Sequence, residues 1–334
     1  MAPSVPFFIA FIYGLVILAA SFSYLGIAVN ITIVGPGAIG SLWAIKLLQA
    51  GHNVSLWSRS SDHSIELSLD GQPSLPISNN NIERLAASDL VIFTVKAWQV
   101  ETATTPLLQH LDPDTILMFM HNGMGAVDNI ATQVDGCPVV LATTTQAAFK
   151  PSRNHVSHTG LGHTQLGAFN QVGQQCTFLV DVLNHALPEV SWNPEIKTAL
   201  WTKLAINCAI NPLTGLKQIK NGELADHQFE GVLRSIVQEL TEVMQAEGIA
   251  CSFDELAASV KRVILATAEN YSSMQQDMFY QRKTEVDFIS GHLIKTALKH
   301  GIKVPVNQKL FAQVKEQEKR WDHEYSPATL NKSR

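Results

Sequence analysis

A lysine and two asparagines recur at a spacing of four residues in the second half of the chain. Lys203, Asn207 and Asn211 therefore share one face of the helix that the pattern from Glu195 to Asn211 predicts. An apolar stripe with the same spacing lies beside them. One interpretation is a solvated helix face. The other is a wall of amides with an ammonium group at one end, which suits a polar ligand because amides donate and accept hydrogen bonds without adding charge.

A glycine-rich turn near the start of the chain carries a second chemical signal. Gly35-Pro-Gly-Ala-Ile-Gly40 follows the apolar run from Asn30 to Val34 and precedes a predicted helix from Ser41 to Gln49. This order of strand, turn and helix is typical of a dinucleotide-binding unit. The first glycine would make the tight turn, the second would let the backbone approach a diphosphate, and the third would let the helix pack on the strand. The diphosphate would lie on the helix N-terminus.

The segment after the next predicted strand, Asn53 to Trp57, bears on the choice of dinucleotide. An enzyme that uses NAD usually places Asp or Glu about 20 residues after the glycine motif, to bind the ribose 2′-hydroxyl. Here Arg59 stands between Ser58 and Ser60. A guanidinium with hydroxyl neighbours suits a 2′-phosphate and hence NADP, and the alternative is a solvated surface arginine.

A sheet must position these groups. Further strand-like runs span residues 90–95, 116–120 and 139–144. They alternate with helical patterns such as Val100 to Leu111 and predict an α/β, Rossmann-type, doubly wound parallel sheet. Ligands of such sheets bind at the carboxyl ends of the strands. Lys96 and Asn122 each follow a strand and are candidate ligand-binding residues by position.

The second half predicts an all-helical domain. After the first helix, which we expect Pro212 to end, helical patterns span residues 223–247, 254–269, 275–299 and 307–320. Spacing alone does not single out Glu285, whose basic neighbours indicate a surface salt bridge. We expect an apolar leader over 1–28, an NADP-binding domain over 29–193, a substrate and catalytic domain over 194–323, and a flexible tail over 324–334.

Composition excludes several classes of protein. A length of 334 residues suits two domains, and a net charge of −5 argues against a general nucleic-acid binder. Four cysteines without a close pair form neither a disulfide framework nor a zinc ribbon, and they fit a reducing compartment. His155, His158 and His163 match no helical metal motif, so no metal site is predicted.

Residues 7–28 contain no charged side chain and are long enough to span a bilayer as a helix. Three interpretations stay open: translation that starts near Val29, a membrane anchor, or a signal peptide. The last is weakened because no Lys or Arg precedes the apolar stretch. The expected location is cytoplasmic, or membrane-anchored through residues 7–28 with the enzyme domain in the cytoplasm.

The ordered set of motifs resembles the ketopantoate reductases, the NADPH-dependent 2-dehydropantoate 2-reductases of pantothenate biosynthesis. The resemblance covers residues 30 to about 320. The matching segments lie at residues 35–40, 95–99, 121–125, 143–145, 201–204, 207–214, 221–224, 272–277 and 284–287. The glycine motif is generic, whereas Lys203-Leu204 followed by Asn207 and Ile210-Asn-Pro-Leu-Thr214 is specific. Pro36 departs from the family, which usually has a small residue there.

The resemblance also implies residue roles. Lys203 is similar to the family's general acid, and Glu285 to its active-site carboxylate. The implied substrate-binding residues are Asn122, Lys203, Asn207, Asn211, Asn221 and Ser273. The implied contacts to NADPH, or NADP+ after oxidation, are Gly35, Pro36, Gly37, Ala38, Ile39, Gly40, Arg59, Lys96, Asn122, Ala148 and Glu285.

The implied chemistry is transfer of hydride from nicotinamide C4 to the ketone carbon of ketopantoate. A lysine ammonium stabilises the charge on the carbonyl oxygen and gives up a proton. This requires a pKa of Lys203 lowered towards neutrality, a shift that Glu285 opposes. The expected partner is the small-molecule substrate, with the protein a monomer or homodimer. The alternatives are a reductase of another 2-oxo acid and a non-catalytic NADP-sensing protein.

Overall fold

The apolar, β-branched runs of the first half form a seven-stranded sheet. The structure is a computed structural model and describes residues 28–324. The strands follow the order β11-β10-β7-β6-β5-β1-β2. Their bounds are β11 (Val190–Trp192), β10 (Thr164–Ala168), β7 (Val139–Thr144), β6 (Ile116–Met120), β5 (Leu90–Phe93), β1 (Asn30–Val34) and β2 (Asn53–Trp57). The five strands from β7 to β2 are parallel as predicted, whereas β10 is antiparallel to β7.

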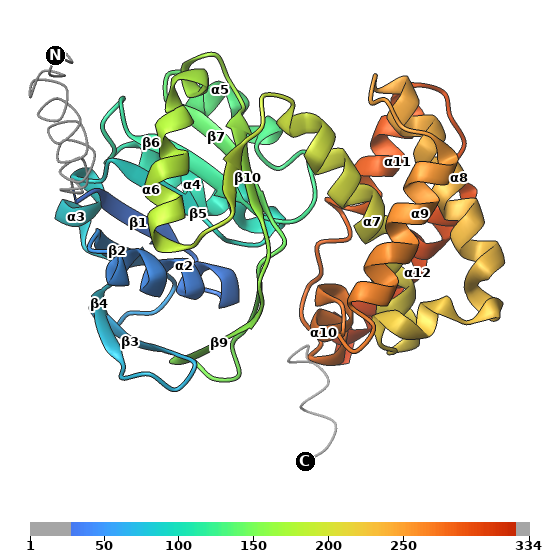
Figure 1. The fold of residues 1–334 in the computed structure, drawn as a ribbon, viewed down its shortest axis with the longest axis horizontal. Helices are drawn as coiled ribbons and strands as arrows, with labels where there is room; N and C mark the ends of the chain where they lie inside the picture. The colour runs from blue at the N-terminus through green and yellow to red at the C-terminus, as the bar shows by residue number, and fades with distance from the viewer. Residues whose placement is uncertain (1–27, 325–334) are drawn as a thin grey trace, which may run out of the picture.

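Helices cover both faces of this sheet, as in a doubly wound fold. On one face pack α2 (Ala38–Gln49) and α6 (Leu179–Ala186), and on the other pack α3 (Ile82–Ala86), α4 (Val100–Leu108) and α5 (Ala131–Val134) (Figure 1). Short 3-10 turns lie beside these helices at η1 (Ala97–Gln99), η2 (Asp128–Ile130) and η3 (Val172–Phe178).

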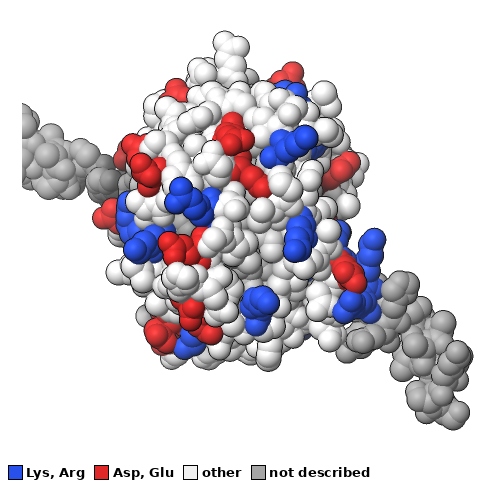
Figure 2. Space-filling model, turned by 90° about the vertical axis from the view of Figure 1, so that its right-hand side faces the viewer, with Lys and Arg blue, Asp and Glu red and all other residues white. Residues whose placement is uncertain are grey.

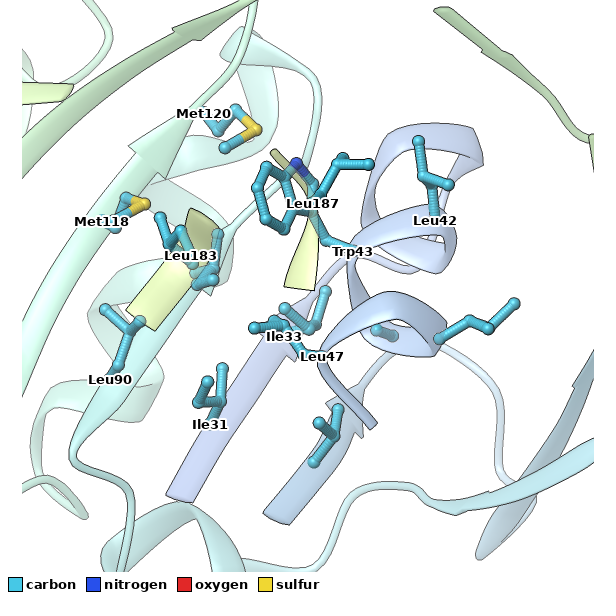
Figure 3. Packing of buried hydrophobic residues seen from close by; sticks show 14 of the residues in the cluster. Ile31, Ile33, Leu42, Trp43, Leu47, Leu90, Met118, Met120, Leu183 and Leu187 are labelled. Atoms are coloured by element: carbon cyan, nitrogen blue, oxygen red, sulfur yellow. The ribbon is translucent and has the colours of Figure 1, made fainter. Parts of the chain in front are cut away.

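The core on the α2 face fixes the glycine turn relative to the sheet. Trp43 and Leu47 of α2 lie over Ile31 and Ile33 of β1, and Leu183 of α6 closes the cluster (Figure 3). The Trp43 side chain is completely buried. Burying side chains of this size stabilises the packing of α2 by about 1.5–3 kcal/mol each. The N-terminus of α2 is thereby held at the carboxyl end of β1.

A second sheet, which the sequence did not predict, extends the nucleotide half. It has the order β4-β3-β9-β8. Its strands are β4 (Leu75–Ser78), β3 (Ser64–Leu69), β9 (His155–Gly160) and β8 (Ala147–Phe149). His155 and His158 lie on β9, and His163 directly precedes β10. Their imidazoles hydrogen-bond to Ser68, Gln146 and Ser191, in that order. Within residues 28–324 no group of three or more His, Cys, Asp or Glu residues is placed to hold a metal ion.

The rest of the described chain is helical and forms a second body beside the sheet (Figure 1). Its helices are α7 (Ile196–Lys217), α8 (Glu230–Ala246), α9 (Phe253–Ala266), α10 (Ser273–Phe279), α11 (Ser290–Lys299) and α12 (Pro305–Glu324). Two 3-10 turns, η4 (Asn221–Ala225) and η5 (His227–Phe229), precede α8 where the sequence predicted a continuous helix. The other predicted helices differ from these bounds by only a few residues, with two exceptions.

The first exception is the end of α7. We predicted that Pro212 ends this helix, and the prediction was wrong, because α7 continues to Lys217 and ends at Gln218 with a positive φ of 55°. An internal proline costs about 3 kcal/mol because it removes a hydrogen bond and crowds the preceding turn. Pro212 is buried, however, and α7 packs against α8, α9, α10 and α12. This burial outweighs the local penalty.

The second exception is the predicted helix over residues 275–299. It was wrong, because α10 ends at Phe279, α11 begins at Ser290, and Gln281 between them has a φ of 51°. The intervening segment is tied to α12, since the Glu318 carboxylate accepts hydrogen bonds from the backbone N–H and hydroxyl of Thr284. The break turns the chain so that Glu285 lies away from any helix face.

The surface of the helical body carries mixed charge. On the face that Figure 2 shows, acidic and basic side chains are interspersed, and its described residues form no continuous basic area of the kind that a nucleic-acid backbone requires. Between residues 28 and 324, no helix is both long and apolar enough to cross a bilayer. The predictions for the apolar leader and for the tail after Glu324 lie outside the described residues.

Candidate active site

A cleft of about 1070 Å³ opens at the carboxyl ends of the parallel strands. It is bounded by the glycine turn, the segments after β2, β5 and β6, and residues from the helical body. Of the residues singled out from the sequence, its walls contain Gly35, Pro36, Gly37, Ala38, Ile39, Arg59, Lys96, Asn122, Ala148, Lys203, Ser273 and Glu285. The fold thus brings together residues that lie up to 250 positions apart in sequence.

The glycine turn has the shape that a bound diphosphate needs. Gly35 adopts a φ of +84°, which favours glycine. A Cβ on Gly37 would meet only the Gly35 carbonyl oxygen, at an ordinary contact distance of 3.9 Å, whereas a Cβ on Gly40 would lie 2.6 Å from that oxygen and closer still to the Thr94 hydroxyl. No side chain caps α2, so the N–H groups of its first turn are free for an anion. These residues fit a dinucleotide.

The different surroundings of Gly37 and Gly40 predict different effects of replacing each by alanine. Gly40→Ala should lower the free energy of unfolding by about 1–3 kcal/mol, because the new methyl group overlaps the strand side of the turn. Gly37→Ala should leave stability within about 0.5 kcal/mol of the parent and weaken dinucleotide binding, because its methyl group fills only the cleft. Thermal unfolding and fluorescence titration with NADPH measure the two effects. Equal losses of stability in both variants would contradict this assignment of roles.

Lys96 joins the two halves of the molecule. Its ammonium Nζ lies 2.6 Å from Asp277 Oδ2 of α10 and 3.4 Å from Glu285 Oε2. Burial alone would lower the pKa of Lys96, but the two carboxylates raise it above the ordinary lysine value. Lys96 therefore stays charged and carries an ion pair from the end of β5 to the helical body. Neither the partners of Lys96 nor a role for Asp277, which has no periodic signal, could be predicted from the sequence.

The Glu285 carboxylate is buried and accepts three hydrogen bonds. Only 4% of its side chain is exposed. Its Oε1 accepts from the Ala97 backbone N–H at 3.0 Å, and its Oε2 accepts from Asn122 Nδ2 at 3.2 Å and from Lys96. The expectation of a surface salt bridge was wrong, because the break between α10 and α11 carries this carboxylate into the cleft.

Lys203 of α7 also lines the cleft, one helical turn from Asn207. Its ammonium donates a hydrogen bond of 2.8 Å to the Thr144 carbonyl oxygen at the end of β7. Burial lowers the pKa of Lys203 to about 8, although the negative charge of Glu285 opposes the shift. An ammonium with this pKa is mostly protonated at neutral pH and is a stronger acid than an exposed lysine.

Three of the predicted amides do not line the cleft. Asn207 and Asn211 lie further along α7, and their side-chain amides make no hydrogen bond within the described chain. Asn221 is buried in η4, where its Nδ2 donates to Thr267 Oγ1 at 2.9 Å and its Oδ1 accepts no hydrogen bond from any described residue. Ser273, at the first position of α10, does line the cleft.

Two basic residues of the cleft were missed by the sequence reasoning. Lys150 donates hydrogen bonds to the Pro36 carbonyl at 2.7 Å and to Ser41 Oγ at 2.9 Å, and so holds the glycine turn from outside. Burial, with a smaller contribution from Arg153, lowers its pKa to about 8. Arg153 lines the same end of the cleft as Arg59. Both missed residues follow β8, a short strand with no clear periodicity, so no local signal could have found them.

Two family descriptions match the chain, in the same order as its two bodies. Residues 31–171 match "Ketopantoate reductase PanE/ApbA", and residues 195–318 match "Ketopantoate reductase PanE/ApbA C terminal".

Individual proteins are similar over most of the chain. A 2-dehydropantoate 2-reductase of Vibrio cholerae is 52% identical over 292 residues, which is 87% of this chain and 99% of the relative. The crystal structure of a PanE/ApbA family ketopantoate reductase from Ralstonia eutropha JMP134 superposes with a TM-score of 0.79 at 25% identity, covering 88% of this chain and 99% of that one. D-mandelate dehydrogenase, in a ternary structure with NADH and anilino(oxo)acetate, superposes with a TM-score of 0.78 at 22% identity, covering 87% and 99%.

Proposed function

Because the chain belongs to the ketopantoate reductase family and is an oxidoreductase that acts on a CH–OH group, we propose that it reduces 2-dehydropantoate to pantoate with NADPH, as a step of pantothenate biosynthesis. The observation that carries this proposal is the placement of Lys203. Its ammonium, with a pKa of about 8, lies in the same cleft as the glycine turn. We also propose that residues 29–193 bind the cofactor and that residues 194–323 supply the substrate-binding and catalytic groups.

The cleft supplies the contacts that NADPH would need. The N–H groups at the start of α2 would hold the diphosphate, and Arg59 would hold the 2′-phosphate. Lys96, Asn122, Ala148 and Glu285 would line the part of the cleft nearer to Lys203. When bound, the dihydronicotinamide supplies the hydride that reduces the ketone carbon. The protein's own contribution is binding, orientation and control of the proton.

Lys203 would act as the general acid. Negative charge grows on the carbonyl oxygen during reduction, and an ammonium beside it stabilises that charge and then gives up a proton. The hydrogen bond to the Thr144 carbonyl holds Nζ in place without neutralising its charge. The negative charge of Glu285 raises the pKa of Lys203 and so favours the protonated form in the free enzyme.

The amides and the hydroxyl of the helical body would bind the substrate. Asn207 and Asn211 lie outside the walls of the cleft but have unused hydrogen-bonding groups on the face of α7 that begins with Lys203, whereas Ser273 lines the cleft itself. Together with Asn122 and Asn221 they offer donors and acceptors for a carboxylate and a hydroxyl group. Neutral amides can bind these groups without raising or lowering the charge around Lys203.

The second candidate function is reduction of another 2-oxo acid. D-mandelate dehydrogenase has the same fold, so the fold does not choose the substrate. A steady-state assay of the purified protein with 2-dehydropantoate and a panel of 2-oxo acids, each with NADPH and with NADH, tests the proposal. We expect the highest kcat/KM with 2-dehydropantoate and NADPH. A higher kcat/KM with a different 2-oxo acid would select the second function, and no oxidation of NADPH with any of them would favour a sensing protein.

The pKa of Lys203 predicts the pH dependence of the reaction. A lowered pKa means that the proton is present below about pH 8 and is lost as the pH rises through that value. We expect kcat/KM for the 2-oxo acid, measured at saturating NADPH, to fall above about pH 8. Saturation with NADPH removes the contribution of Lys150 to cofactor binding. A profile that stays flat to pH 10 would show that Lys203 is not the acid.

A further inference from the structure

A second arginine reaches the Arg59 end of the cleft from a distant part of the chain. Arg153 lies between β8 and β9, and together with Arg59 and Ser60 it lines the cleft. Its guanidinium Nη2 donates hydrogen bonds to Ser60 Oγ and to the carboxylate of Asp62. Arg59 makes no hydrogen bond or ion pair with any described residue. Arg59 is thus without a partner among the described residues, and Arg153 reaches the same corner of the cleft while paired with Asp62.

The segment that faces Arg153 is held in shape by the protein itself. Asn79 Nδ2 donates to the Asp62 carbonyl at 2.7 Å, and Asn80 Nδ2 donates to the Ser60 carbonyl at 2.6 Å. The backbone N–H of Ser58 donates to Asn80 Oδ1 at 2.9 Å. The backbone of Ser60 and Asp62 is thus held in place without a ligand. The Ser60 hydroxyl and the Asp62 carboxylate, which bind Arg153, are positioned by the same contacts.

The ion pair between Arg153 and Asp62 is easily replaced. The two side chains are 63% and 52% exposed, and exposed pairs of this kind contribute little to stability. A phosphate monoester carries up to two negative charges and three acceptor oxygens. It can therefore bind Arg153, Arg59 and the Ser60 hydroxyl at once, whereas the Asp62 carboxylate carries one charge and, among the described residues, accepts only from Arg153 and Ser60.

We propose that Arg153 is a specificity-determining residue for the 2′-phosphate of NADPH, and that this phosphate takes the place of the Asp62 carboxylate on Arg153 and Ser60. The inference rests on the proposed function, because it concerns the cofactor assigned there. Arg59 then binds the phosphate from the segment after β2, and Arg153 binds it from the loop after β8. Asp62 occupies the phosphate position in the free protein and competes with the cofactor.

The proposal predicts effects of opposite sign for two neighbouring residues. Arg153→Ala should weaken NADPH binding about tenfold or more, because it removes a charge-assisted hydrogen bond. Asp62→Asn should strengthen NADPH binding, because it removes a competing negative charge and leaves Arg153 in place. Neither substitution should change the affinity for NADH by more than about twofold. An ion pair that merely ties two loops together would instead make both variants bind both dinucleotides more weakly.

The test is isothermal titration of the full-length protein with NADPH, NADH, 2′-phospho-ADP-ribose and ADP-ribose. Arg262→Ala, which removes an exposed arginine from α9, is the matched control. The result expected is selective loss with Arg153→Ala and selective gain with Asp62→Asn, seen with both phosphorylated ligands. Unchanged NADPH affinity in Arg153→Ala, or an equal loss for NADH, would overturn the inference. A parent protein that binds NADPH and NADH equally would overturn the cofactor assignment itself.

Discussion

Replacing Lys203 by alanine is expected to lower kcat by about 10²–10⁴-fold, the range that positioned acid catalysis contributes. The substitution removes the ammonium that would stabilise the carbonyl oxygen and leaves the Thr144 carbonyl without its 2.8 Å donor. The fold should persist, because a partly buried charge is removed and α7 keeps its apolar contacts. Steady-state kinetics with 2-dehydropantoate and NADPH measure the loss, and thermal unfolding checks the fold.

Lys203→Arg separates the two roles of the ammonium. A guanidinium keeps the positive charge but does not release a proton in the working pH range, since its pKa lies far above that range. We expect this variant to lack the fall in kcat/KM above pH 8 and to remain far below the parent in kcat. Lys217→Ala, at the exposed end of α7, is the matched control and should keep full activity. Near-normal kcat in Lys203→Ala would remove Lys203 from the acid role.

Replacing Glu285 by glutamine is expected to impair both catalysis and the junction between the two bodies. The glutamine can keep the acceptor for the Ala97 N–H, but it places an amide donor opposite Lys96 and Asn122, which are donors themselves. It also removes the negative charge that opposes the lowering of the Lys203 pKa. The pKa of Lys203 should then fall further. We expect kcat/KM near pH 8 to drop about tenfold or more, because less of the lysine is protonated.

The pH profile distinguishes this explanation from a general loss of structure. In Glu285→Gln the fall in kcat/KM should begin at a lower pH than in the parent, whereas a merely structural defect would reduce activity at every pH alike. Glu316→Gln, on the exposed side of α12, is the matched control. An unshifted profile would show that Glu285 does not set the protonation of Lys203.

Local sequence patterns were sufficient to predict those elements whose structure depends mainly on neighbouring residues. The strands β1, β2, β6 and β7 follow from short strand-like runs, and the glycine turn follows from its position between a strand and a helix. The spacing of Lys203, Asn207 and Asn211 placed them on one helix face. The parallel core of the sheet followed from the alternation of strands and helices. Each of these depends on neighbours within a few residues.

Other features depended on contacts between distant residues. Pro212 marks a helix end by local rules, yet packing against four helices carries α7 past it. The break at Gln281 has no glycine or proline to mark it, and a buried carboxylate on α12 holds it. The orientation of β10, antiparallel in a parallel sheet, is set by its pairing with β7.

The sequence by itself determined the class of fold, the glycine turn and the polar stripe that contains Lys203, because each depends on residues that lie close together along the chain. Only the tertiary structure decided how these parts act as one site. It brought Glu285 and Asp277 to Lys96, placed Lys203 against the end of β7, and set Arg153 beside Ser60 and Asp62. The pKa of Lys203 is decided there too, since burial and a distant carboxylate set it, and neither can be read from neighbours in sequence.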